Sequence, residues 1–274
     1  MAVCEVCFRH CEINEGAAGA CGARICREGK VVAGNYGRIT GLALDPIEKK
    51  PLNRFCPGSK ILSVGSYGCN LFCPFCQNHD ISRSDGRDFC DEITPEKLAD
   101  IALKYESRGN IGVAFTYNEP LVGYEFVRDT AKLVRERGMK NVLVSNGTAE
   151  ISILEEILPY MDAMNIDIKS MSEDTYRNIL KGDLKTTRSF IERAVKDCHV
   201  ELTMLIVPGM NDTEEEMREL SSWIRSLSED IPLHISRFFP RYKMTDREPT
   251  DVGKIYHLAD IAKESLKYVY TGNC

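Results

Sequence analysis

From residue 60 onward, short apolar runs alternate with amphipathic segments along the chain. Six strands are predicted, in the runs ILSVGSYG, IGVAFTYNEP, KNVLVSNG, AMNIDIKS, HVELTMLIVPG and LHISRFFP. The segments between these runs have the spacing of amphipathic helices. Two of the helices have clear start signals: Thr94 precedes Pro95, and Thr213 with Glu216 forms a capping box. Repeated strand and helix units predict a parallel sheet with right-handed crossovers.

The length of this alternating region defines the predicted fold. Residues 59–274 are fewer than the roughly 250 residues of a full eight-unit barrel, so we expect an α/β fold with a partial (β/α)6 barrel of TIM type. Residues 1–58 are rich in cysteine and glycine and have no long helical pattern. They predict a small N-terminal Cys-rich metal-binding module. In parallel α/β folds, ligands bind at the carboxyl ends of the strands, so the residues there are the candidate site.

Charge and composition narrow the classes of partner. The chain has 35 basic and 41 acidic residues, a net charge of -6, which argues against binding to nucleic acid or to an anionic membrane surface. It has no long uncharged apolar run, and its first residues do not resemble a signal peptide. We therefore expect a cytoplasmic protein whose partners are small molecules or other proteins. Twelve cysteines in a reducing compartment indicate metal binding or redox chemistry rather than disulfides.

Three cysteines follow the first predicted strand directly. Cys69, Cys73 and Cys76 form a CxxxCxxC motif. A four-iron cluster needs four ligands, so three thiolates would leave one iron free to bind another molecule. The alternatives are a structural zinc site completed by His79, or three buried cysteines without a metal.

This motif, placed after the first strand of a partial barrel, resembles the radical S-adenosylmethionine (radical SAM) superfamily. The resemblance implies that Cys69, Cys73 and Cys76 hold a 4Fe–4S cluster, and that the amino and carboxylate groups of SAM bind the fourth iron. Phe75 matches the aromatic position near adenine, although loop packing would also explain it. The implied reaction is the one-electron cleavage of SAM to methionine and a 5'-deoxyadenosyl radical, which abstracts hydrogen from a substrate. No side chain is needed as an acid or base, so no catalytic residue is assigned.

Two further strand ends have polar residues that suit SAM binding. Asn118 and Glu119 stand where the superfamily usually has a Gly-Gly-Glu stretch, and Glu119 would accept hydrogen bonds from the SAM ammonium group. The alternative is a turn with Glu119 at a helix start. Ser145 and Asn146 would bind the ribose hydroxyls, or else form a loop with a helix cap.

The fourth and sixth strands carry charged or titratable groups. Asp167 and Lys169 lie on the same face of one strand and resemble the DxK stretch of glycyl-radical-enzyme activases, where such residues lie near SAM. A structural ion pair is the competing interpretation. His234 lies on an apolar strand, where a hydrogen-bonded core histidine is more common than a catalytic one.

A second cysteine group lies near the N-terminus. It consists of Cys4, Cys7, Cys11 and Cys21, with His10 and Cys26 as spare donors. Four thiolates fit either a closed zinc site or an auxiliary iron–sulfur cluster. The spacing lacks the second CxxC of many zinc ribbons and is looser than that of ferredoxins; we favour zinc, with the cluster as the alternative.

Across nearly the whole chain, four segments carry a narrower resemblance. They are YGRITGLALDPIEKKPL, PGSKILSVGSYGCNLFCPFCQN, TYNEP and HISRFFPRYKM. Together with the N-terminal cysteine module they resemble the radical SAM enzymes of the AmmeMemoRadiSam system, which are related to pyruvate formate-lyase activating enzymes. The resemblance implies an oxidoreductase-like radical SAM enzyme with an unidentified substrate and an electron donor such as ferredoxin or flavodoxin. The alternatives are a glycyl-radical-enzyme activase that acts on a partner protein, and a non-catalytic metal-binding interaction protein.

Overall fold

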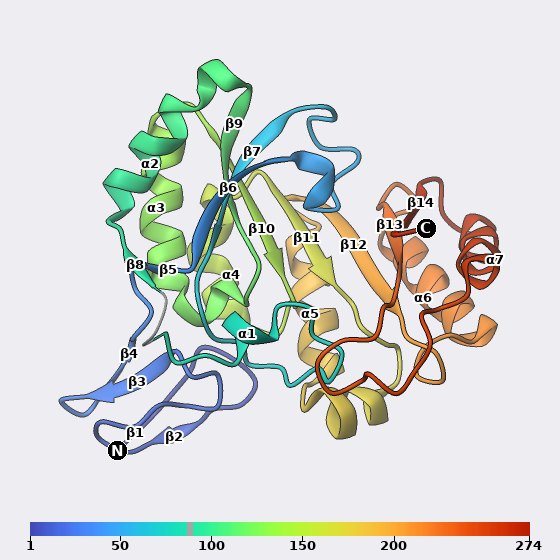
Figure 1. Ribbon diagram of the computed structural model, residues 1–274, viewed down its shortest axis with the longest axis horizontal. Coiled ribbons are helices and arrows are strands. Elements are labelled where there is room, and N and C mark those ends of the chain that lie inside the picture. Colours follow the sequence, from blue (N-terminus) through green and yellow to red (C-terminus); the bar gives the residue numbers. More distant parts are fainter. Residues whose placement is uncertain (87–89) are drawn as a thin grey trace.

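A parallel sheet forms the centre of the molecule. The computed structural model describes residues 1–86 and 90–274, and within these ranges the main sheet has eight strands in the order β14-β13-β12-β11-β10-β9-β7-β6 (Figure 1). Strands β7 to β14 of this sheet run parallel, and the edge strand β6 is antiparallel to β7. The strands are β6 (Gly41–Pro46), β7 (Lys60–Gly65), β9 (Asn110–Phe115), β10 (Lys140–Ser145), β11 (Ala163–Asp167), β12 (His199–Ile206), β13 (Leu233–Arg237) and β14 (Val269–Gly272).

Helices connect successive parallel strands. After the short α1 (His79–Ser82), they are α2 (Pro95–Lys104), α3 (Tyr124–Glu136), α4 (Ile151–Ile157), α5 (Leu184–Ala194), α6 (Glu214–Leu227) and α7 (Val252–Lys263). The described residues thus contain six strand–helix units, which confirms the predicted α/β partial barrel. Strands β6 and β14 were not predicted. They are the two edges of the sheet and do not pair with each other, so the barrel is open between them.

The predicted helix starts are present, with one difference. Thr94 accepts a hydrogen bond from the amide of Lys97, and Thr213 accepts one from the amide of Glu216. The side chain of Glu216 does not complete the capping box. It instead accepts hydrogen bonds from Ser170 and from the amide of Met171, so it ties α6 to the loop after β11.

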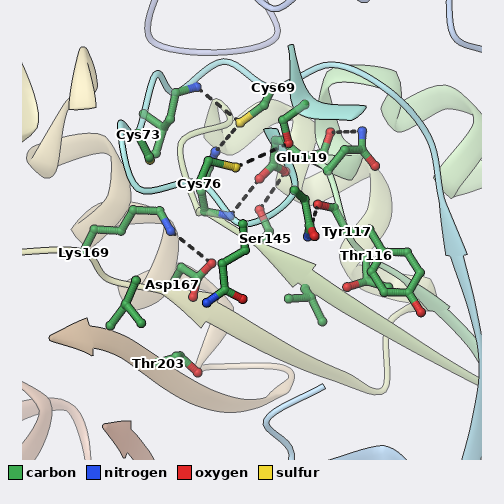
Figure 2. A pocket seen from close by; sticks show the side chains of 18 of the residues that line it. Cys69, Cys73, Cys76, Thr116, Tyr117, Glu119, Ser145, Asp167, Lys169 and Thr203 are labelled. Carbon is green, nitrogen blue, oxygen red and sulfur yellow. Dashed lines mark hydrogen bonds and ion pairs between the residues drawn. The ribbon is translucent and has the colours of Figure 1, made fainter. Parts of the chain in front are cut away.

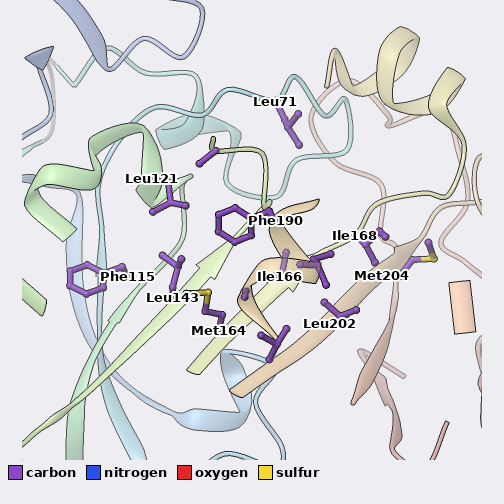
Figure 3. Close-up of a cluster of buried hydrophobic side chains, with 14 of the residues drawn as sticks. Leu71, Phe115, Leu121, Leu143, Met164, Ile166, Ile168, Phe190, Leu202 and Met204 are labelled. Atoms are coloured by element: carbon purple, nitrogen blue, oxygen red, sulfur yellow. The ribbon is translucent and has the colours of Figure 1, made fainter. Parts of the chain in front are cut away.

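Most of the hydrophobic core lies between the sheet and its helices. Figure 3 shows part of it, where buried side chains of β9 to β12 meet Phe190 of α5. The labelled residues include Phe115, Leu143, Met164 and Leu202, all at most 2% exposed. Burial of this size supplies the main favourable free energy of folding and fixes the strand ends in place.

A second, smaller cluster fills the barrel interior. Ile47 and Leu52, from the segment between β6 and β7, pack against Ile61, Ala114, Val142 and Ala163, which come from β7, β9, β10 and β11. Polar contacts fix this segment: Asn165 donates to the carbonyl of Pro51, and Glu201 accepts from the amides of Asn53 and Arg54. The segment therefore closes one end of the barrel and leaves the other end for ligands.

The N-terminal region is held together by short elements. Strands β1 (Ala2–Val3) and β2 (Glu12–Ile13) form one hairpin-like pair, and β3 (Arg24–Arg27) and β4 (Lys30–Ala33) form another, at one end of the molecule in Figure 1. A further short pair joins β5 (Arg38–Ile39) to β8 (Asp91–Glu92). The division at residues 58 and 59 stays a prediction; residues 41–46, on its N-terminal side, belong to the main sheet as β6. Among the described residues, no helix is long and apolar enough to cross a membrane.

Candidate functional site

One cavity lies at the carboxyl ends of the parallel strands. It measures about 330 Å³, and its lining includes every residue that the sequence predicted to bind the cluster or SAM. These residues are Cys69, Cys73, Phe75, Cys76, Asn118, Glu119, Ser145, Asn146, Asp167 and Lys169. Figure 2 labels seven of them, which come from the loop after β7 and from the ends of β9, β10 and β11 or the residues just after: Cys69, Cys73, Cys76, Glu119, Ser145, Asp167 and Lys169.

The loop after β7 carries the three cysteines in a fixed conformation. The amide of Leu71 donates to the Sγ of Cys69 at 3.4 Å, and the amide of Cys76 donates to the carbonyl of Cys73 at 3.2 Å. Arg83 donates to the carbonyl of Cys69, and the thiol of Cys76 lies 3.8 Å from the hydroxyl of Ser82. The local hydrogen bonds leave all three sulfurs on the cavity wall.

The donor set fits an iron–sulfur cluster. Burial raises the pKa of the Cys69 thiol, with a further contribution from Glu119, and it raises the pKa of Cys73 to about 11. Unliganded thiols in such a place would stay protonated, whereas a metal stabilises thiolates. Within residues 1–86 and 90–274, no three His, Cys, Asp or Glu side chains are arranged to hold a single metal ion. Cys69, Cys73 and Cys76 all line the cavity, and His79 is not among its lining residues.

Glu119 is the buried carboxylate of the cavity. It is 3% exposed and accepts hydrogen bonds from the Ser145 hydroxyl at 2.9 Å and from the amides of Asn146 and Leu121 at 2.7 and 3.0 Å. Burial raises the pKa of Glu119 to about 7, although these hydrogen bonds act in the opposite direction. Glu119 caps the short helix η3 (Pro120–Gly123), as the alternative interpretation predicted, and it also lines the cavity. Its contact with SAM stays a prediction.

Two predicted SAM-binding amides are already engaged with the protein. The side chain of Asn118 accepts from the amide of Ser66 and donates to the carbonyls of Tyr67 and Gly68, so it fixes the start of the cysteine loop. The side chain of Asn146 donates to the Oδ1 of Asn70 at 3.0 Å and lies 3.7 Å from the Sγ of Cys69. Both residues line the cavity, and both are placed to hold the cysteine loop.

Asp167 and Lys169 form an ion pair of 3.2 Å on the wall opposite Glu119. Burial by itself would lower the pKa of Lys169, but the adjacent Asp167 carboxylate and Cys73 thiol outweigh it and raise that pKa. The backbone around Lys169 is fixed, because its amide donates to Tyr176 and its carbonyl accepts from Asn211. The lysine is therefore a permanently charged donor at the cavity edge.

The cavity also contains a buried group that the sequence analysis missed. Lys50, 2% exposed, forms an ion pair of 2.9 Å with Asp45 and lies over the ring of Tyr117, whose hydroxyl donates to the same carboxylate at 2.7 Å. Burial opposes ionisation of Asp45, but the hydrogen bonds from Lys50 and Tyr117 prevail and lower its pKa to about 2. Tyr117 adopts a φ of +75°, a conformation uncommon for a non-glycine residue. The adjacent lysines in the sequence were the only signal for this group.

His234 lies outside this cavity, in a satisfied buried position. Its Nε2 is 2.7 Å from Glu201, which also contacts His199 at 3.0 Å. The prediction of a hydrogen-bonded core histidine is therefore confirmed. Glu201 itself was not identified from the sequence, where it reads as one charged residue within an apolar strand.

Comparison with known proteins agrees with this geometry. A profile of the radical SAM superfamily matches residues 63–221. A Methanocaldococcus jannaschii protein, MJ0808, is 41% identical over 274 residues, covering 98% of this chain and 80% of its own. The pyruvate formate-lyase-activating enzyme of Clostridium pasteurianum is 30% identical over 216 residues, covering 73% of this chain and 89% of its own.

Solved structures show the same fold. Streptococcus suis SuiB bound to S-adenosylmethionine superposes with a TM-score of 0.61 at 13% identity, covering 78% of this chain and 52% of that one. The chain belongs to the radical SAM superfamily. It is an enzyme of the radical SAM type, so the alternative of a non-catalytic metal-binding protein is set aside.

Proposed function

We propose that this enzyme cleaves SAM reductively at a 4Fe–4S cluster held by Cys69, Cys73 and Cys76, and that the resulting 5'-deoxyadenosyl radical abstracts hydrogen from a substrate. The observation that carries the proposal is the single cavity that gathers these cysteines with the polar ends of three neighbouring strands. When bound, the cluster supplies the electron that breaks the carbon–sulfur bond of SAM. An external one-electron donor of the ferredoxin or flavodoxin class would provide that electron.

The residues of the chain bind and orient SAM in this proposal. The Glu119 carboxylate would accept hydrogen bonds from the SAM ammonium group, and the Lys169 ammonium would pair with the SAM carboxylate. The Ser145 hydroxyl, which now donates to Glu119, lies where it could also reach the ribose. Phe75, 4% exposed, offers an apolar surface to adenine. Asn118 and Asn146 position the cysteine loop through the contacts described above.

The substrate would occupy the other wall of the same cavity. That wall contains Lys49, Lys50, Tyr117, Thr203, Ser236 and Asn273. Lys50 follows the edge strand β6, and Asn273 follows the opposite edge strand β14. The cavity therefore reaches the lateral opening of the barrel, where it is lined from both unpaired edges.

This opening supports a second candidate function, activation of a partner protein. An opening between two unpaired strand edges admits an extended peptide segment more readily than a closed barrel would. The Clostridium pasteurianum relative is named for activation of pyruvate formate-lyase, a protein. On this alternative, the radical would abstract a hydrogen from the backbone of a partner chain.

The test is anaerobic reconstitution with iron and sulfide, followed by dithionite and SAM, with 5'-deoxyadenosine measured by chromatography. We expect product from the wild type and a loss of at least about 100-fold in each of Cys69→Ala, Cys73→Ala and Cys76→Ala, because a three-ligand set has no spare donor. Cys198→Ala is the matched control and should keep full activity, since Cys198 does not line the cavity. Undiminished product from any of the three variants would contradict the proposal.

A further inference from the structure

Phe72 is an exposed aromatic residue in the middle of the CxxxCxxC loop. Its chain neighbours Leu71 and Cys73 are buried and line the cavity of the proposed SAM site, whereas Phe72 is 39% exposed and does not line that cavity. Its ring therefore lies on the outer side of the loop, one peptide bond from a proposed cluster ligand. In the proposed function SAM and the substrate fill the cavity, so the outer side of the loop is the side open to another protein.

Two arginines hold the Phe72 ring at the surface. The guanidinium carbon of Arg83 lies 4.3 Å from the ring centroid, and that of Arg9 lies 5.0 Å from it. The same carbon of Arg9 is also 5.0 Å from the ring centroid of Phe8. Contacts between a guanidinium and an aromatic face are favourable even at exposed sites. Phe8, Arg9, Phe72 and Arg83 thus form one contiguous group of alternating aromatic rings and cations.

The backbone of the cysteine loop fixes both arginines. Arg83 donates to the carbonyl of Cys69, and the Nε of Arg9 donates to the carbonyl of Asn70 at 2.8 Å. Arg9 also donates to the carbonyl of Lys181. Side chains that are already ordered lose little conformational entropy when a partner binds, and arginine and aromatic residues are common at the centres of protein interfaces. This surface is therefore preorganised for a protein partner.

The N-terminal region places Arg9 beside the loop. Arg9 lines a small cavity of about 10 Å³ with the four cysteines of the predicted metal group, Cys4, Cys7, Cys11 and Cys21. Among the residues that the structure describes, no three His, Cys, Asp or Glu side chains are arranged to hold a metal ion. Metal binding by these four cysteines stays a prediction, and the contacts of Arg9 with the loop do not depend on it.

Two exposed lysines extend the positive charge around Phe72. The amide of Phe72 donates to the carbonyl of Leu180 at 2.8 Å, and Lys181 follows directly after the short helix η5 (Thr175–Leu180). The amide of Lys243 donates to the carbonyl of Pro74 at 2.9 Å. Both lysine side chains are exposed. We call this surface the basic patch and define it by Phe72, Arg9, Arg83, Lys181 and Lys243.

The arginines of the patch keep their charge and most of their donors free. In the described part of the chain, Arg9 uses two of its five N–H donors and Arg83 uses one, and all three bonds go to backbone carbonyls, which have no net charge. By contrast, Arg128, Arg137 and Arg193 each pair with a carboxylate. The remaining donors suit bidentate bonds to carboxylates of another molecule. The patch is therefore a locally positive surface on a chain of net charge -6.

We propose that the basic patch is the docking surface of the electron donor, a small acidic one-electron carrier protein of the flavodoxin or ferredoxin class. Carboxylates of the donor pair with Arg9 and Arg83, and its redox centre lies against the ring of Phe72. One electron leaves the reduced donor, which is oxidised by one electron, and enters the cluster, which is reduced by one. The inference rests on the proposed SAM-cleaving function and adds the place where the electron enters.

The test compares a protein donor with a small reductant. The double variant Lys181→Glu and Lys243→Glu reverses two exposed charges of the patch, and neither residue lines the SAM cavity. With limiting photoreduced flavodoxin or reduced ferredoxin at low salt, the rate of 5'-deoxyadenosine formation should fall at least about tenfold, because charge reversal at an interface slows association. With dithionite, which needs no docking surface, the rate should equal that of the wild type.

The matched control reverses the same number of charges at the other end of the strands. Lys60 begins β7, and Lys196 lies just before the start of β12; both are exposed. The double variant Lys60→Glu and Lys196→Glu should keep the wild-type rate with both kinds of reductant. A loss as large as that of the patch variant would show that total charge, and not the patch, determines the rate.

The response to salt gives a second signature. The chain and an acidic donor are both negative overall, so docking at an average part of the surface would speed up as salt screens their repulsion. Docking at the basic patch should instead slow down as salt rises, because salt screens the local attraction. A donor-driven rate that rises with salt in the wild type would contradict the proposal.

Binding of the oxidised carriers tests the surface without SAM cleavage. Titration calorimetry at low salt should show binding of oxidised flavodoxin or ferredoxin to the wild type, and Phe72→Ala should weaken it at least about fivefold by removing the central ring. The iron content of this variant reports whether its loop is intact. Unchanged binding by Phe72→Ala and by the double lysine variant would overturn the proposal.

The remaining outcomes separate this proposal from the proposed function. Product with dithionite but with neither carrier, or an equal loss with dithionite in the double lysine variant, would overturn the docking surface and leave SAM cleavage standing. No product from the wild type with dithionite would contradict SAM cleavage itself. In that case the calorimetric titrations would still decide whether an acidic carrier binds the patch.

Discussion

Replacement of Glu119 by glutamine tests the proposed SAM-binding site most sharply among single substitutions. Glu119 is buried at the cavity wall and accepts three hydrogen bonds from the protein, which glutamine can only partly retain. The substitution preserves size and removes the charge that would pair with the SAM ammonium. A hydrogen bond between charged groups contributes about 1.5–3 kcal/mol, so SAM should bind about 10- to 150-fold more weakly to the variant.

The pH dependence gives a second, independent signature of this contact. Because the pKa of Glu119 is raised to about 7, its carboxylate becomes protonated as the pH falls below 7. Only the ionised form attracts the SAM ammonium, so the affinity of the wild type should fall about tenfold per pH unit below 7. Glu119→Gln should show no such decline.

The assay is equilibrium binding of SAM to the reconstituted enzyme, measured from pH 5.5 to 8. Glu156→Gln is the matched control, since Glu156 is an exposed residue that pairs with Arg128 outside the cavity. Equal affinity of wild type and Glu119→Gln at pH 8, or the same pH dependence in both, would refute the assigned contact.

Three other substitutions test different parts of the structure. Glu201→Gln should lower the free energy of unfolding by about 3 kcal/mol at pH 7. Burial raises the pKa of Glu201, but its hydrogen bonds with two histidines and two backbone amides outweigh burial and lower that pKa from 4.5 to about 2. This stabilisation is complete above pH 4.5 and is lost toward pH 2. Urea titrations should therefore show that the difference in unfolding free energy between the wild type and Glu201→Gln shrinks by about 1 kcal/mol from pH 6 to pH 4. A constant difference would contradict the lowered pKa of Glu201. Lys50→Met leaves the partly buried Asp45 carboxylate without its buried cation, with only Tyr117 and the exposed Lys49 as partners, and should lower the unfolding free energy by about 2–3 kcal/mol. Lys49→Met, 68% exposed at the side chain, should lower it by less than about 1 kcal/mol. Lys169→Met should weaken SAM binding by at least about tenfold in the same equilibrium assay. Unaltered affinity would show that the ion pair between Asp167 and Lys169 is structural and does not bind SAM.

The sequence predicted the barrel because local patterns determine it. Continuous apolar runs such as IGVAF mark strands buried on both faces, and the helices between them have regular amphipathic spacing. Edge strands have weaker patterns. Neither β6 nor β14 has a fully buried position, so neither stood out from its surroundings.

The site residues were predictable where chemistry and strand ends coincide. Glu119 and Lys169 lie within four residues after the ends of β9 and β11, and the topology of a parallel sheet brings such positions to one edge. The contribution of Lys50 was not predictable, because its segment returns into the barrel only through tertiary packing of Ile47 and Leu52. The role of Asn146 toward Cys69 depends on a loop conformation that no local pattern encodes.

The central claim is that SAM binds in the cavity directly beside a cluster held by the CxxxCxxC loop. The most direct measurement is electron–nuclear double resonance of the reduced enzyme with SAM labelled by nitrogen-15 at its amino group and by oxygen-17 at its carboxylate. We predict hyperfine coupling from both labels to the cluster of Cys69, Cys73 and Cys76, with the same couplings after Cys26→Ser. A reduced cluster at these cysteines that shows no coupling to either label in the presence of saturating SAM would contradict it.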